Sequence, residues 1–321
     1  MKKIFTVLFL SLSISFFAQR DTTFVLTPKD TSWKTNGFLG LNISQTSLNY
    51  WQGGGEDNFS LVSIFNYEAN YTRNSNEWSS KIDAQYGLIK TGNSTIFKKN
   101  ADQLFAFTRY SLHTSKKHLF YSLMADFRSQ FSPGYNYYAD SIAPGIVSNF
   151  MAPAYIQLAL GMEYKLDDYF SATLSPLAGK VTIVNDRGLA DAGAFGVEAA
   201  KLDTAGKVIT PGQKVRYEFG GRFTLKFKRD LNKFVNLDTY ADFFSNYMHN
   251  PQNVDVVWNT LITIKINKFL SATFTSKMIY DDDIVIKYDW NKDGKYDHKN
   301  DVNGPRAQWL TSFGFGLGYK F

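Results

Sequence analysis

The final stretch of the chain, residues 309–321, alternates large apolar side chains with small or polar ones. The apolar positions are Phe313, Phe315, Leu317, Tyr319 and Phe321. Successive side chains of a strand point to opposite faces, so this pattern predicts a strand with one apolar face. A soluble protein that ended in such a strand would expose an aromatic patch and an unpaired edge. The pattern therefore predicts that lipid covers the apolar face and that another strand covers the edge.

The same stretch resembles the closing strand of an outer-membrane β-barrel, in which the terminal aromatic residue serves as a signal for insertion. The resemblance implies that the outer-membrane insertion machinery is a partner. The assembly signal that it implies is formed by Phe313, Phe315, Leu317, Tyr319 and Phe321.

The beginning of the chain predicts export. Lys2 and Lys3 precede an apolar run over 4–17, and the small residue Ala18 follows that run. This is the pattern of a secretory signal peptide over 1–18, and it is too short to span a membrane. Residues 19–35 are polar and show no periodicity, so we expect a flexible lead-in in the periplasm.

The region 36–321 predicts a single barrel domain, because twelve segments show strand periodicity. They are approximately Asn36–Leu48, Asn58–Thr72, Glu77–Thr91, Asp102–Thr114, His118–Phe131, Ala154–Leu166, Tyr169–Ile183, Lys214–Arg229, Phe234–Tyr247, Val254–Ile266, Phe269–Tyr280 and Ala307–Phe321. Short and long connections alternate between them, which predicts an all-β fold, a transmembrane antiparallel up-and-down β-barrel of about twelve strands. The predicted location is the outer membrane, with extracellular long loops and both termini in the periplasm. A β-sandwich is the structural alternative, but its inner face would be apolar and its strands shorter.

Composition narrows the classes of partner and chemistry. Aromatic residues make up 17% of the chain, as expected for belts at two membrane interfaces. The net charge of +6 includes Lys2 and Lys3 of the leader, and lipid phosphates are ready partners for basic groups, so we expect membrane lipid and no nucleic acid. The chain has no cysteine, which excludes disulfides and thiolate chemistry.

Several motifs resemble a family of uncharacterised outer-membrane proteins of the Bacteroidota that is catalogued as a domain of unknown function. The stretches that carry the resemblance are 50–54 (YWQGG), 130–135 (QFSPGY), 152–155 (APAY), 189–196 (LADAGAFG), 251–253 (PQN) and 280–283 (YDDD). The resemblance implies a barrel and its location, and it implies no activity.

Charged residues recur on the strand face that is predicted to point into the lumen. The candidates for lumen-lining residues are Lys81, Asp83, Arg109, Arg128, Glu163, Arg216, Glu218, Arg222, Asp238 and Asp242. Both signs are mixed, so two interpretations stay open: a narrow polar channel with charge-tuned selectivity, or an interior that paired side chains fill.

The favoured function is therefore passive transport of small polar solutes, ahead of a non-conducting structural or interaction barrel. A hydrolase on the outer wall is the third interpretation. The histidines are His113, His118, His249 and His298, and all are predicted at turns or loops rather than at mid-strand, where a bound acyl chain would need a base. We therefore predict no catalytic residue, no enzyme activity and no required cofactor.

Three long loops have distinctive content. The loops over 132–153 and 184–211 carry aromatic, apolar and small residues, which suits either a lid folded into the mouth or a cap of loops packed on each other. The last loop resembles a calcium loop, with oxygen donors at alternate positions around a glycine. The predicted ligands are Asp289, Asn291, Asp293, Lys295 (through its carbonyl) and Asp297. The alternative there is a solvated hairpin tip.

Overall fold

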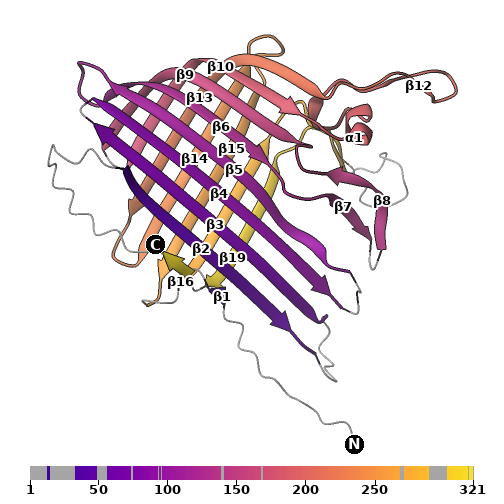
Figure 1. The fold of residues 1–321 in the computed structure, drawn as a ribbon, viewed down its shortest axis with the longest axis horizontal. Helices are drawn as coiled ribbons and strands as arrows, with labels where there is room; N and C mark the ends of the chain where they lie inside the picture. Colours follow the sequence, from indigo (N-terminus) through magenta and orange to yellow (C-terminus); the bar gives the residue numbers. More distant parts are fainter. Residues whose placement is uncertain are drawn as a thin grey trace, which may run out of the picture.

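The computed structural model describes residues 13–14, 33–48, 56–73, 75–92, 94, 96–138, 141–167, 169–267, 271–288, 302–316 and 318–320. Within these ranges, twelve long strands and two short ones form one antiparallel sheet, which curls strongly (Figure 1). Each long strand pairs with the next one along the chain. The signal peptide, the lead-in and the calcium loop lie almost entirely outside the described residues, so these predictions are not tested.

The long strands coincide with the twelve segments predicted from the sequence. They are β2 (Trp33–Thr46), β3 (Asn58–Arg73), β4 (Asn76–Thr91), β5 (Lys98–His113), β6 (Leu119–Ser129), β9 (Ala154–Asp167), β10 (Phe170–Ile183), β13 (Val215–Asp230), β14 (Val235–Asn246), β15 (Val254–Lys265), β16 (Ser271–Tyr280) and β19 (Gln308–Gly316). The predicted all-β antiparallel fold is confirmed. So is the alternation of connections: the short ones are 74–75, 114–118, 168–169, 231–234 and 266–270, and the others are longer.

The two ends of the meander meet. β20 (Gly318–Lys320) continues the line of β19 and pairs with β2, which sets Phe38 opposite Lys320 and Gly40 opposite Gly318. A two-residue strand, β1 (Ser13–Ile14), pairs with β2 next to this ladder. The predicted pairing of the last strand with another strand is therefore observed over the described part of β20.

The two faces of the sheet have opposite chemistry. Along β9, Leu158, Leu160 and Met162 are 53%, 49% and 39% exposed, whereas Ala159 and Glu163 between and beside them are 1% and 0% exposed. Side chains of the shielded face reach strands that are not their neighbours in the sheet, which requires the concave side. We call the concave side the inner face and the convex side the outer face. A β-sandwich would bury apolar residues instead, so the observed faces contradict that alternative.

Aromatic side chains gather on the outer face where β2 to β5 approach the short connections. The ring of Trp33 lies 5.3 Å from that of Tyr71 and 5.8 Å from that of Trp78, and Trp78 lies 6.3 Å from Tyr110. β2 begins at Trp33, three residues before the predicted start at Asn36. The Trp33 ring packs on Tyr71 and Trp78, and this packing explains the earlier start. The sequence did not predict it, because the polar residues around Trp33 show no periodicity.

The long connections contain small elements of their own. These are the hairpin β7 (Gly134–Tyr138) and β8 (Ser141–Ser148), the helix α1 (Arg187–Asp191), the 3₁₀ turn η1 (Ala194–Gly196), the hairpin β11 (Lys201–Leu202) and β12 (Val208–Thr210), and the hairpin β17 (Ile286–Tyr288) and β18 (Val302–Gly304). Figure 1 shows β7, β8, α1 and β12 gathered beyond one end of the long strands, with β12 projecting farthest. None of the helices in the described part of the chain has the length and apolar character needed to cross a membrane.

Candidate functional site

The ten charged residues predicted to line the lumen lie on six strands and point to the inner face. They are Lys81 and Asp83 on β4, Arg109 on β5, Arg128 on β6, Glu163 on β9, Arg216, Glu218 and Arg222 on β13, and Asp238 and Asp242 on β14. Each takes part in an ion pair with another inner-face residue. Most belong to one of three clusters, which lie at the middle of the sheet, toward the short connections and toward the long connections.

The central cluster joins β6, β13 and β14. Arg222 is 2% exposed, and its Nε and Nη2 donate to the two carboxylate oxygens of Asp242 at 2.8 and 3.0 Å. Its Nη1 donates to Asp126 Oδ2 at 2.6 Å, across the two strands that separate β13 from β6. Arg128 lies 3.4 Å from Asp126 and 3.5 Å from Asp242. Two arginines and two aspartates thus balance each other in a dry environment.

The turn-side cluster lies toward the short connections and joins β4, β5 and β9. Arg109 donates to one carboxylate oxygen of Glu163, and Ser111 Oγ donates to the other at 3.1 Å. Lys165 pairs with Glu77 on β4 and lies 3.5 Å from Glu163. Glu163 is fully buried, and its two oxygens are both engaged, so it has the partners that a buried carboxylate requires.

The mouth cluster lies toward the long connections. Lys180 of β10 is its centre, with its Nζ 2.7 Å from Asp255 Oδ2, 3.3 Å from Asp281 Oδ2 and 3.5 Å from Glu218 Oε2. Asp255 belongs to β15, and Asp281 directly follows β16. One buried lysine therefore ties four elements together at the rim of the sheet.

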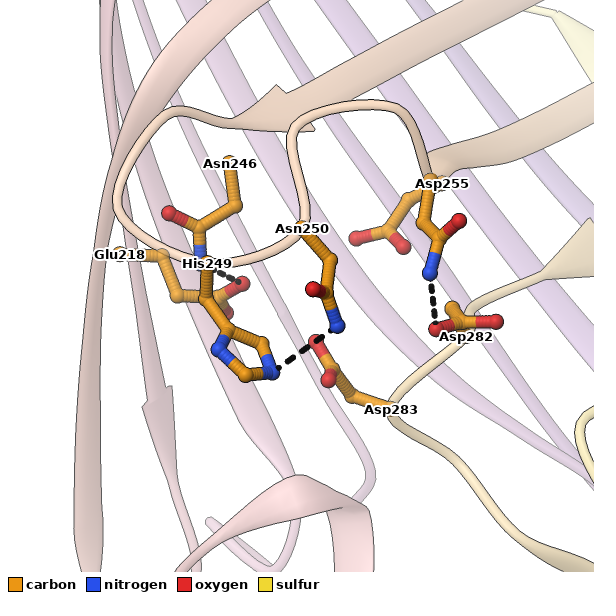
Figure 2. A pocket seen from close by; sticks show the side chains of 8 residues that line it. Glu218, Asn246, His249, Asn250, Asp255, Asp282 and Asp283 are labelled. Atoms are coloured by element: carbon orange, nitrogen blue, oxygen red, sulfur yellow. Dashed lines mark hydrogen bonds between the residues drawn. The ribbon is translucent and has the colours of Figure 1, made fainter.

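Arg216 forms the second half of the mouth cluster. It donates to Glu218 at 3.0 Å, to Asp283, and to the carbonyl oxygen of Gly196 at 3.3 Å. Gly196 has a φ of +81°, and a Cβ there would lie 2.4 Å from Arg216 Nη1, so only glycine allows this approach. Figure 2 shows Glu218 and Asp283 facing a small cavity that is also lined by Asn246, His249, Asn250, Asn253, Asp255 and Asp282.

Sequence reasoning missed Lys180, and a β-bulge explains why. The pairing of β10 with β13 shifts between Ser175 and Ala178, and its pairing with β9 shifts between Leu174 and Leu177. Strict alternation from Ser175 would put Lys180 on the outer face, and the extra residue moves it to the inner face. Pro176 was the available signal, because proline inside a strand often marks a bulge. Asp255 was also missed, although its strand was predicted.

The inner face has a dry wall and a wetter wall. On β6, β9, β10 and β14, Met124, Ala159, Ala178 and Phe244 form a buried apolar cluster between the central and mouth clusters. On the opposite wall, Leu310 of β19 faces inward and is 55% exposed. Inward-facing Gln103 of β5 is exposed as well. Gln103 and Leu310 both lie toward the long connections, so the interior is open to solvent beside β5 and β19 at that end.

The long loops pack on each other above the dry wall. Ala152, Val184, Ala190 and Val197 form a second buried apolar cluster, with Leu189 and Phe195 packed against it. These residues come from the connections 130–153 and 184–214. In their described parts, the two loops thus form a cap, and the small-residue run is what fills its centre.

The described residues include only some of the histidines and none of the predicted metal ligands. Within them, no group of three or more His, Asp or Glu side chains is arranged to hold a metal ion. The predicted calcium ligands Asp289, Asn291, Asp293, Lys295 and Asp297 lie outside the described residues. His113 packs on the ring of Phe120, with centroids 4.7 Å apart, and His249 lies 3.2 Å from the side chain of Asn250.

The chain is similar to a protein family without assigned activity and to a solved structure at low identity. A family model described as "Protein of unknown function (DUF3078)" matches residues 43–135, which confirms a resemblance to a family without assigned activity. No curated protein matches the chain. One similar solved structure is that of the COG4313 outer membrane channel from Pseudomonas putida F1. It is 11% identical, with a TM-score of 0.38, and the alignment covers 92% of this chain and 100% of that chain.

Proposed function

We propose that the curled sheet is a closed β-barrel in the outer membrane and that it passes small polar solutes through a narrow lumen. The observation that carries this proposal is the inverted distribution of polarity. Ion pairs and hydroxyls cover the inner face, and large apolar side chains cover the outer face. In a membrane, lipid covers an apolar outer face. A polar inner surface is stable there when water solvates it or when its charges pair with each other.

The aromatic row of Trp33, Tyr71, Trp78 and Tyr110 supports the same environment. Tryptophan and tyrosine prefer the boundary between hydrocarbon and headgroups, where the ring is shielded and its polar atom is solvated. The row lies toward the short connections, on the outer face of four adjacent strands. It would therefore mark the periplasmic boundary, with lipid as the partner of the strand surfaces beyond it.

The passage would run beside the wetter wall. There, inward-facing side chains such as Gln103 and Leu310 are exposed, while the central cluster on the other side excludes water. An off-centre passage of this kind is narrow because half of the interior is filled. Small polar molecules are the class that such a lumen admits without a dedicated transport cycle.

A non-conducting barrel is the second candidate, and the dry wall favours it. Arg222 reaches from β13 to β6, and Phe244 lies in the apolar cluster beside it. If the loops complete this filling, the charges serve to hold the barrel together. The protein would then act through its extracellular cap, as a structural or interaction barrel.

Single-channel recording separates the two candidates. The purified, folded protein should give a steady conductance in planar bilayers, because water lines one wall. The chain has no cysteine, so Gln103→Cys and Leu310→Cys provide unique thiols on that wall. A charged methanethiosulfonate reagent should reduce their conductance. Thr224→Cys, on the dry wall, is the matched control and should not respond. A folded barrel that stays silent at all voltages would support the second candidate.

Orientation has its own test. The proposal puts the long connections outside the cell and the short ones in the periplasm. In intact cells, an impermeant thiol reagent should label Ala205→Cys, at the exposed tip of the hairpin β11–β12 in the 184–214 loop. It should not label Lys117→Cys in the short connection 114–118, although disrupted cells should show both. Labelling of Lys117→Cys alone in intact cells would reverse the orientation.

A further inference from the structure

Three consecutive aspartates, Asp281, Asp282 and Asp283, follow β16 at the mouth, and each has a different partner. Asp281 pairs with Lys180 at 3.3 Å, and Asp283 pairs with Arg216. Asp282 accepts hydrogen bonds from Asn253 Nδ2 at 2.5 Å and from the Tyr280 hydroxyl at 3.2 Å. The negative charge of Asp282 thus has only neutral donors among the contacts that hold it.

The mouth cluster carries more negative than positive charge. Its cations are Lys180 and Arg216, and its carboxylates are Glu218, Asp255, Asp281, Asp282 and Asp283. Two positive charges against five negative ones leave an excess of three negative charges. The central cluster beneath it is balanced and buried, and Lys277 adds one partly buried inward-facing cation on β16.

Glu218 shows that the cluster has unused capacity to accept a cation. Its side chain is 1% exposed and lines the cavity of Figure 2, and its Oε2 accepts no hydrogen bond from the described residues. The nearest cation to that oxygen is Lys180, at 3.5 Å. The cavity has room for about one water molecule, or a group of that size such as an ammonium. Asn246, Asn250 and Asn253 also line the cavity, and the amide nitrogens of Asn246 and Asn253 donate to Glu218 Oε1 and to Asp282.

We infer that this mouth selects cationic solutes and that small organic amines are the preferred class. The inference rests on the proposed function, because it names what the passage admits. Carboxylates at a narrow entrance raise the local concentration of cations and repel anions, and a partly desolvated site strengthens both effects. The ammonium group of a solute is a suitable partner for the Glu218 oxygen and for the carboxylates of Asp282 and Asp283 in the same lining.

Asp282 and Asp255 are the best positions to test, because their substitution leaves no cation without a partner. Asp282→Asn removes a charge that is held by neutral donors. Asp255→Asn leaves Lys180 with Asp281 and Glu218. The double variant lowers the excess from three negative charges to one. Asp203→Asn is the matched control, since Asp203 lies at the tip of the hairpin β11–β12, away from the mouth.

The experiment measures reversal potentials in a tenfold gradient of potassium chloride across a planar bilayer. We expect wild type and Asp203→Asn to prefer potassium over chloride by about threefold or more, and the double variant to lose most of that preference. Spermidine added to the extracellular side should block the wild-type current. The double variant should need a concentration about tenfold higher for the same block. Heat-dependent gel mobility of each variant would show that it is folded.

The outcomes separate this inference from the proposed function. A folded channel that conducts without preference, or that prefers chloride, would overturn the inference and leave the passage intact. Equal preference and equal spermidine block in wild type and the double variant would also overturn it, since the charge would then come from elsewhere. A folded barrel with no conductance would overturn the proposed function itself.

Discussion

Removal of the Arg222 guanidinium should destabilise the fold more than removal of any other single charge on β13. Arg222 makes four hydrogen bonds: two to Asp242, one to Asp126 and one to the Tyr240 hydroxyl. The substitution Arg222→Met keeps most of the aliphatic stem and removes every donor. Asp126 and Asp242 are 3% and 4% exposed, so they would stay buried with Arg128 as their only nearby cation.

The magnitude follows from the cost of an unpaired buried charge. Breaking a buried pair from one side costs about 3–5 kcal/mol, because the remaining charge keeps its desolvation penalty. All four bonds are charge-assisted, because the guanidinium donor is charged, and the three that end on carboxylates are worth about 1.5–3 kcal/mol each. Arg128 compensates for part of their loss. We therefore expect the free energy of unfolding to fall by about 3–5 kcal/mol.

Urea unfolding in lipid vesicles, followed by tryptophan fluorescence and gel mobility, measures this change. Lys228→Met is the matched control on the same strand: its Nζ lies 3.6 Å from Asp238, and its side chain is 45% exposed. Such a pair is worth at most about 1 kcal/mol. The double variant Arg222→Met with Asp126→Asn removes one charge of each sign, and it should recover at least half of the loss. A change below about 0.5 kcal/mol for Arg222→Met would refute the view that this cluster is dry.

Three further predictions concern backbone packing, assembly and metal. Gly220→Ala should lower the yield of folded protein, because its Cβ would lie 1.9 Å from the Ser245 carbonyl oxygen, whereas Gly179→Ala, with its nearest neighbour at 3.9 Å, should fold normally. Deletion of Phe321 should reduce the amount of folded barrel in the envelope, and normal levels would exclude a role in assembly. Calcium should slow proteolysis of the last long loop, and Asp293→Ala should abolish that protection; equal cleavage with calcium and with chelator would leave only a solvated turn.

The strands could be predicted from the sequence because the relevant signal is local. Alternation of side chains within β9 or β14 is fixed by residues next to each other, and an apolar face opposite a polar one makes that alternation strong. The connections could be predicted for the same reason, since Asn, Asp and Gly favour turns through local backbone preferences. The face of Lys180 could not be read in this way, because one extra residue in a bulge reverses the alternation beyond it.

The partners of the inner-face charges could not be predicted either. Arg222 and Asp126 are 96 residues apart, and Lys180 and Asp281 are 101 residues apart. Which charges meet depends on the register of several ladders and on the curvature of the sheet, and neither is encoded by residues near Arg222. The sequence offered two interpretations of the interior, a channel or a filled core. The structure fills one wall with paired charges and apolar side chains and leaves side chains of the other wall more exposed, so the filled interior describes one part of the inner face and the channel remains a proposal.

In the proposed channel, this division of the inner face would separate stability from permeation. The dry wall holds the balanced charges of the central cluster and the apolar side chains of Met124 and Phe244, so substitutions there change how strongly the strands are held together. The exposed wall carries Gln103 and Leu310, which have fewer neighbours to lose, so substitutions there change what the passage admits at little cost in stability. The mouth cluster belongs to both, because Lys180 holds strands together while the carboxylates around it exceed its charge. Under the proposed function, a single fold would therefore keep a rigid barrel and still vary its selectivity through residues at one rim.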